Sequence, residues 1–282
     1  MVFGTFSDRK RLVANRSLAL CRNEWGGIRL RTEEPIDAAI NWSPTFHMRP
    51  NSTLIVAVEV NEYLFPEILK IAAHDIEHYN FPIAVYQACP LDVYQNDARL
   101  ARANLLADHG FGLITVDDAG TTRIHTRAEP LAQHIPKSRF DIALRPLTQR
   151  LKIRFRAAYA TYHIDIGQGL QAAGQIIEAM ITCIAKHAEA NGVVPARTSN
   201  RGTADIIDAL SPTNAFRNYR AALGGARHFA NRYRNIASHN PRGPQEAAEK
   251  LRRCKEGFLE ALHIAEELRA VMLQLGCPLR II

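Results

Sequence analysis

The chain has 282 residues, 47% of them hydrophobic and 22% charged, a composition that excludes a disordered or low-complexity protein. Its net charge of +7 resides entirely in residues 151–282, where 18 Lys and Arg face 11 Asp and Glu. No apolar run approaches the roughly 18 residues of a membrane span, so we expect a cytoplasmic protein without a membrane partner. Five cysteines without a C-x-x-C spacing indicate reduced core thiols rather than disulfides or a zinc ribbon.

Residues 1–145 have the pattern of an α/β domain with a mixed sheet. The run over 53–60 is almost continuously apolar, as expected of a central strand. Strands are predicted, in chain order, over 27–31, 36–42, 53–60, 83–88, 111–116 and 122–126. Helices are predicted between them over 65–79 and 97–108, and Pro130, Pro136 and Pro146 mark a linker.

Residues 150–282 have the pattern of an all-α bundle. Apolar residues recur at three-four spacing from 166 to 188, and the last helix carries a heptad repeat. Helices are predicted over 166–190, 203–210, 214–233 and from Pro244 to a stop at Gly276. The heptad suits either the core of a four-helix bundle or a dimer seam.

The charge of the second half is concentrated in one segment. Residues 209–245 contain no acid. They hold Arg217, Arg220, Arg227, Arg232, Arg234 and Arg242. Such a segment fits either a polyanion partner or a solvated basic face.

Within this segment, Arg234 and His239 are five positions apart and Asn235 follows the arginine. A bare match of this kind is expected about once by chance here, so its context matters. The motif ends a long helix and precedes a long amphipathic one. Residues 155–276 thereby resemble the HEPN family, the nucleotide-binding domains of higher eukaryotes and prokaryotes, which are helical bundles that carry an Arg, a polar residue, three more residues and a His.

The resemblance implies a metal-independent endoribonuclease. It also implies a homodimer in which both copies of Arg234 and His239 face one groove, and a role in toxin–antitoxin systems or anti-phage defence with an antitoxin or defence partner. The residue types suit RNA cleavage by attack of the 2′-hydroxyl on the adjacent phosphorus, which needs no cofactor. His239 would move the proton, Arg234 would hold the phosphate, and Asn235 would bind the substrate or the imidazole. Arg227 and Arg232 are candidate RNA-backbone contacts.

The first half is similar, over residues 25–127, to the PD-(D/E)xK restriction-endonuclease-like core. Asp37 and Glu59 match its magnesium-binding carboxylates, whereas Asn61 stands where that family has lysine, with Lys70 as a displaced substitute. The similarity implies a degenerate nucleic-acid-binding or structural domain first, and an active magnesium-dependent DNA nuclease second. A non-catalytic RNA-binding or partner-binding protein is the third function class.

Overall fold

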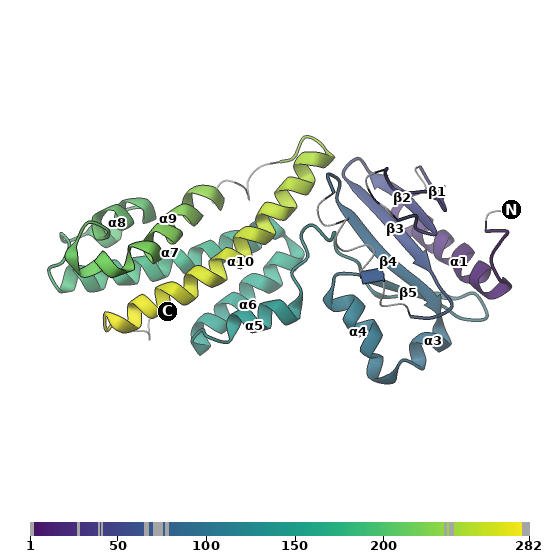
Figure 1. Cartoon of the computed structure of the whole chain (residues 1–282), viewed down its shortest axis with the longest axis horizontal. Helices are drawn as coiled ribbons and strands as arrows, with labels where there is room; N and C mark the ends of the chain where they lie inside the picture. Colours follow the sequence, from purple (N-terminus) through teal and green to yellow (C-terminus); the bar gives the residue numbers. More distant parts are fainter. Residues whose placement is uncertain are drawn as a thin grey trace. The chain divides into compact units, whose positions relative to one another are not determined.

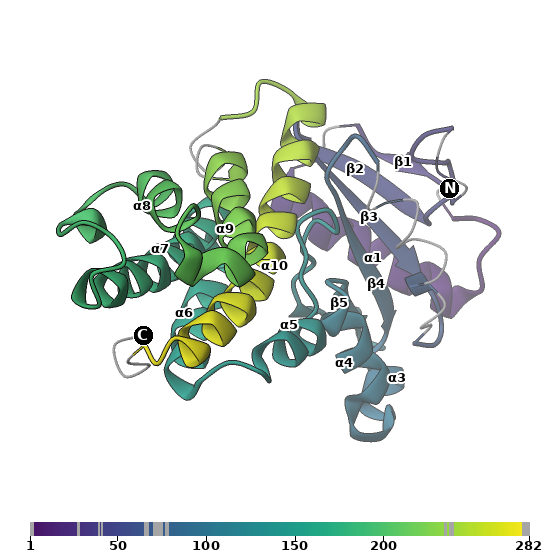
Figure 2. The same cartoon turned by 60° about the vertical axis from the view of Figure 1, so that its left-hand side comes forward.

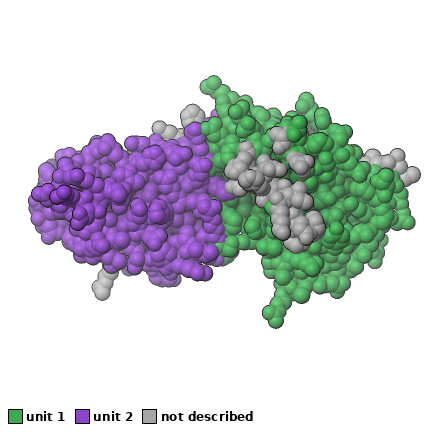
Figure 3. All heavy atoms as spheres, viewed as in Figure 1, with its two compact units in different colours: residues 1–138, 241–252 green, residues 139–240, 253–282 purple. Residues whose placement is uncertain are grey.

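The structure is a computed structural model that describes residues 3–26, 29–38, 40, 42–64, 68–69, 76, 79–233, 236 and 240–277. It divides into two compact units, coloured separately in Figure 3. Unit 1 comprises residues 1–138 and 241–252, and unit 2 comprises residues 139–240 and 253–282. The domains predicted from the sequence are 1–145 and 150–282. Helix α10 (Pro244–Gln274) contributes residues to both units.

Unit 1 is built on a mixed six-stranded sheet in which the strand order follows the sequence (Figure 1). Its strands are β1 (Arg31–Thr32), β2 (Phe46–Asn51), β3 (Leu54–Val60), β4 (Ile83–Pro90), β5 (Gly112–Val116) and β6 (Thr122–Thr126). The central strands β3, β4 and β5 run parallel, and the outer pairings are antiparallel. Parallel strands need crossover connections, and α3 (Leu91–Gln95) and α4 (Ala101–Asp108) lie in the one between β4 and β5.

The two faces of this sheet hold separate apolar clusters because alternate residues of a strand point to opposite faces. Helix α1 (Asp8–Trp25) covers one face, where its Leu18 packs in the same cluster as Val58 of β3. Leu106 of α4 packs with Ala57 of β3 on the other face. Figure 2 shows α1 and α4 on opposite sides of the sheet.

The structure corrects parts of the secondary-structure prediction for unit 1. The described residues of the predicted strand 36–42 form turns, with hydrogen bonds from the Ile40 N–H to the Asp37 carbonyl and from the Trp42 N–H to the Ile40 carbonyl. The side chains of Ile36 and Ile40 in this loop are buried in the core, which explains why the segment has the apolar pattern of a strand. The predicted helix 65–79 falls largely outside the described residues. The sequence patterns predicted none of α1, β2 and α3.

Unit 2 is entirely helical in its described residues, which confirms the predicted α/β-then-all-α fold class. Its helices are α5 (Lys137–Leu144), α6 (Gln149–Ile164), α7 (Ile166–Ala190), α8 (Thr203–Leu210), α9 (Arg220–Tyr233) and the later part of α10. A 3₁₀ turn over Asn214–Tyr219 precedes α9. The predicted linker marked by Pro130, Pro136 and Pro146 contains helix α5, and the boundary between the two units falls within it, after Ser138.

Aromatic contacts and the heptad residues of α10 pack the helices of unit 2 together. Phe258 of α10 lies with its ring centroid 5.1 Å from that of Tyr162 and 6.2 Å from that of Phe140. The heptad residues of α10 within unit 2 are buried inside the chain: Cys254, Phe258, Ala261, Ala265, Leu268 and Met272. The heptad therefore serves the core of this chain rather than a free seam.

Other sequence expectations can be compared with the described residues. All five cysteines are buried and free, as predicted. No described helix combines the length and the apolar character that a bilayer span requires.

Candidate functional site

The candidate catalytic residues occupy the segment that joins α9 to α10. Arg234, Asn235 and His239 lie outside the described residues. The segment starts directly after Tyr233, the last residue of α9. The backbone N–H of Ile236 donates to the Tyr233 carbonyl oxygen at 3.3 Å.

Tyr233 anchors the end of α9 against α10. Its side chain is 2% exposed, and its ring packs over Gly257, where an added Cβ would lie only 2.6 Å from the ring. Its hydroxyl donates to the Glu260 carboxylate, and burial together with this carboxylate raises the pKa of Tyr233 to about 12. The residue before the candidate site is therefore fixed by both packing and a hydrogen bond.

The two predicted RNA-backbone contacts are exposed on unit 2, and each has an acidic partner. Arg227 of α9 pairs with Asp208 of α8 at 2.5 Å, and Arg232 pairs with Glu256 at 3.3 Å. The Arg232 guanidinium also lies 5.2 Å from the centroid of the adjacent Tyr233 ring. Exposed pairs of this kind contribute about 0–1 kcal/mol, so a phosphate can compete for either arginine at small cost.

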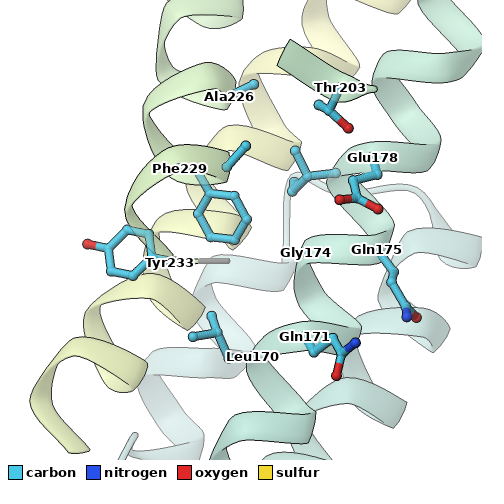
Figure 4. Close-up of a pocket in the computed structure, with 11 residues that line it drawn as sticks. Leu170, Gln171, Gly174, Gln175, Glu178, Thr203, Ala226, Phe229 and Tyr233 are labelled. Atoms are coloured by element: carbon cyan, nitrogen blue, oxygen red, sulfur yellow. The ribbon is translucent and has the colours of Figure 1, made fainter. Parts of the chain in front are cut away.

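A cavity of about 280 Å³ lies between α7, α8 and α9, beside the anchored end of α9 (Figure 4). Its apolar wall includes Phe229 and Ala226 of α9. The polar wall comes from Gln171, Gln175 and Glu178 of α7 and Thr203 of α8. Sequence analysis missed this cavity, although the spacing of the three α7 residues puts them on one helix face beside the apolar stripe.

In unit 1, Asp37 and Glu59 share Trp42 as a neighbour. Asp37 and Trp42 line the same hollow, and the Tyr79 hydroxyl hydrogen-bonds to Asp37. Glu59 accepts hydrogen bonds from the Trp42 side chain and from the Thr45 N–H, the latter at 3.2 Å. Burial nevertheless raises the pKa of Glu59 above its ordinary value, against the lowering effect of these hydrogen bonds.

Protein donors therefore already bind the carboxylates of Asp37 and Glu59. Asn61 follows β3 and donates its backbone N–H to the Ala88 carbonyl at 3.0 Å, and Lys70 lies outside the described residues. Throughout the part of the chain that the structure describes, no group of three His, Cys, Asp or Glu side chains is arranged to hold a metal ion. The predicted pair Asp37 and Glu59 thus has no third such ligand among those residues.

Sequence analysis also missed a row of polar side chains on the sheet face of Glu59. The register pairs Glu59 with Gln87 on the neighbouring parallel strand, and Gln87 Nε2 donates to the Tyr63 carbonyl at 2.9 Å. Farther along the sheet, Thr115 Oγ1 lies 2.8 Å from His125 Nε2. Gln87 and Thr115 are buried at the carboxyl ends of parallel strands, where open α/β sheets commonly place ligands, but here each already has a protein partner.

Comparison with known proteins adds no relative: no family model, no curated protein and no solved structure matches the chain.

Proposed function

We propose that the chain is a metal-independent endoribonuclease that acts through Arg234, Asn235 and His239. The observation that carries the proposal is the position of these residues directly after Tyr233, which is fixed against α10 within an all-helical unit. A catalytic segment needs a rigid support to hold its groups near the reacting atoms.

In this mechanism the 2′-hydroxyl of one nucleotide attacks the adjacent phosphorus. His239 removes the hydroxyl proton as the new P–O bond forms, and the P–O bond to the 5′-oxygen of the next nucleotide breaks. The departing 5′-oxygen takes up a proton from a protonated imidazole. The products are a 2′,3′-cyclic phosphate and a 5′-hydroxyl, so atoms and charges balance without a metal.

The other two side chains have separate roles. Arg234 donates parallel hydrogen bonds to the phosphate oxygens as negative charge accumulates on them. Asn235 hydrogen-bonds to the substrate or orients the imidazole. Arg227 and Arg232 exchange their exposed carboxylate partners for RNA phosphates.

The proposal includes a homodimer in which the two motif copies share one groove. It also includes a cytoplasmic role in a toxin–antitoxin or anti-phage system, with an antitoxin or defence protein as partner. Unit 1 then serves as a degenerate nucleic-acid-binding or structural domain. A magnesium-dependent nuclease at Asp37 and Glu59 is not favoured, because protein donors already bind both carboxylates.

The test is cleavage of a long single-stranded RNA in excess EDTA by the parent protein and by His239→Ala. The matched control is His228→Ala, which removes an exposed histidine of α9. We expect cleavage by the parent and the control, a loss of at least about 100-fold in His239→Ala, and cyclic phosphate ends. Equal cleavage by His239→Ala and the parent would contradict the proposal, as would absence of cleavage by all three.

A further inference from the structure

The cavity of unit 2 has the size of a site for one ring system. Its volume of about 280 Å³ is just below the range of about 300–1,000 Å³ found for pockets that hold drug-sized ligands. α7, α8 and α9 supply all of its lining residues, and Tyr233 at its edge immediately precedes Arg234 in the sequence. A group bound in the cavity would therefore lie beside the start of the candidate catalytic segment.

The apolar side of the cavity offers an aromatic surface. Phe229 lines it and is 5% exposed, and its ring centroid lies 5.4 Å from that of Tyr233. Opposite Phe229, α7 has Gly174, where an added Cβ would be in ordinary van der Waals contact with the ring, 3.6 Å from Phe229 Cε1. Unstacked RNA bases are commonly bound against such aromatic side chains.

The polar side offers an acceptor that has no protein donor. Glu178 is half-buried, and among the described residues its carboxylate has neither a hydrogen bond nor an ion pair. Figure 4 shows it on the same side of the cavity as Thr203, across from Phe229. A carboxylate is an acceptor only, so the complementary ligand must present N–H groups and must not place a phosphate there.

Gln175 and Gln171 lie on the same side of α7, one turn and two turns before Glu178, respectively. Each amide both donates and accepts hydrogen bonds, so the two can bind the carbonyl and ring-nitrogen acceptors of a heterocycle. The polar wall thus combines a carboxylate that only accepts hydrogen bonds with two amides that both donate and accept them.

From these features we propose that the cavity binds a guanine base of the RNA substrate, an inference that rests on the ribonuclease function. Guanine presents N1–H and the N2 amino group side by side, and one carboxylate can accept from both. Its ring lies against the part of Phe229 that lines the cavity, and Glu178 repels the phosphates so that the base edge enters instead of the backbone. Because Tyr233 adjoins both the cavity and Arg234, the bound guanine specifies the position of cleavage.

The experiment measures binding, so it does not depend on turnover. The protein is the His239→Ala variant, and the probes are fluorescent hexauridine strands in which one internal position is guanosine, inosine or uridine. Inosine keeps N1–H and lacks the N2 amino group. We expect the guanosine strand to bind about tenfold more tightly than the uridine strand, with the inosine strand between them.

Two further substitutions, each made in the His239→Ala protein, test the two walls of the cavity. Glu178→Gln removes one acceptor and the charge, and we expect it to abolish the preference for guanosine. Gly174→Leu fills the space before Phe229, and we expect it to weaken binding of the guanosine strand to the level of the uridine strand. The charge-matched control is Glu266→Gln on the exposed side of α10, which should keep the preference.

The outcomes distinguish failure of the proposed guanine site from failure of the proposed ribonuclease function. Equal binding of the three strands, or binding too weak to detect, overturns the guanine site even if the parent cleaves RNA in EDTA. A preference that survives Glu178→Gln overturns it as well. A guanosine preference lost in Glu178→Gln, in a protein whose parent does not cleave RNA, supports the base site and refutes the ribonuclease.

Discussion

Glu59 carries its carboxyl group on a buried sheet face that holds both apolar and polar side chains. Its neighbours on that face include Ala57 on the same strand and Gln87 on the next. Burial raises the pKa of Glu59, although hydrogen bonds from Trp42 and Thr45 act in the opposite direction. The folded protein therefore holds the proton of Glu59 more tightly than the unfolded chain does.

This pKa shift determines how Glu59 affects stability with pH. Its folded-state pKa lies above the ordinary value of 4.5, so its contribution is fully present below pH 4.5 and is lost as pH rises through the folded-state pKa. Glu59→Gln keeps an oxygen acceptor for the Thr45 N–H and cannot ionise. We therefore expect the variant to gain stability relative to the parent as pH rises from 4 to 7.

Urea unfolding of both proteins at several pH values measures this difference. Glu266→Gln, which removes an exposed carboxylate of α10, is the matched control for the loss of one carboxylate. A difference between Glu59→Gln and the parent that stays constant with pH would contradict the raised pKa of Glu59 in the folded protein.

At the scale of elements, glycines set how closely the helices of unit 2 approach one another. An added Cβ at Gly169 of α7 would lie 2.3 Å from the Tyr162 Cα of α6. At Gly257 of α10 it would lie 2.6 Å from the Tyr233 ring and 3.0 Å from Leu170. The end of α9, and with it the start of the candidate site, therefore depends on one small residue of α10.

Gly257→Ala tests this dependence. Alanine favours a helix interior by about 0.5–1 kcal/mol over glycine, but here its methyl group must displace Tyr233, at a cost of about 1–3 kcal/mol. Gly224→Ala in α9 is the matched control, because its Cβ would meet no atom within 4 Å. We expect urea unfolding to show destabilisation in the first variant and stabilisation in the second. Stabilisation in both would contradict the packing account.

The elements that the sequence predicted well are those with a strong apolar period. Both α7 and α10 were predicted, α7 from its three-four apolar stripe and α10 from its heptad repeat. Gly276, with a φ of +71°, follows the end of α10 as expected. β3 was found because nearly all of its residues are buried. In contrast, seven of the 18 residues of α1 are charged and only five are buried, and α5 is short and lies between prolines.

The candidate sites differ in the same way: residues close together in the sequence could be found, and residues brought together only by packing could not. The Arg234–His239 motif could be proposed from the sequence, because its residues are neighbours in the chain. The cavity could not, because Glu178, Thr203 and Phe229 come from three helices whose packing no local pattern specifies. The partners of Asp37 and Glu59 were likewise missed, since Trp42 and Tyr79 reach them from loops.

At the scale of the whole molecule, the excess positive charge belongs to the helical half of the chain. Residues 151–282 account for the net charge of +7, and residues 1–150 are balanced. Basic surface of this kind attracts polyanions and raises their association rates. The charge distribution therefore assigns the RNA contacts of the proposal to unit 2.

The salt dependence of RNA binding tests this assignment. For single strands, the slope of log K against log salt is about −0.7 for each phosphate neutralised. We expect the double variant Arg227→Ala and Arg232→Ala, made in the His239→Ala protein, to reduce the magnitude of the slope by about 1.4. Arg127→Ala, which breaks an exposed ion pair with Glu24 in unit 1, should leave the slope unchanged. An equal effect of both changes would contradict the assignment to unit 2.

The central claim is that the 2′-hydroxyl of RNA is the nucleophile and that no metal takes part. The most direct measurement compares two strands in excess EDTA, one entirely RNA and one with a single 2′-deoxynucleotide at the bond that the parent protein cleaves. The account predicts cleavage of the first strand at that bond and none of the second. Cleavage of both strands at the same bond, or of neither, would contradict it.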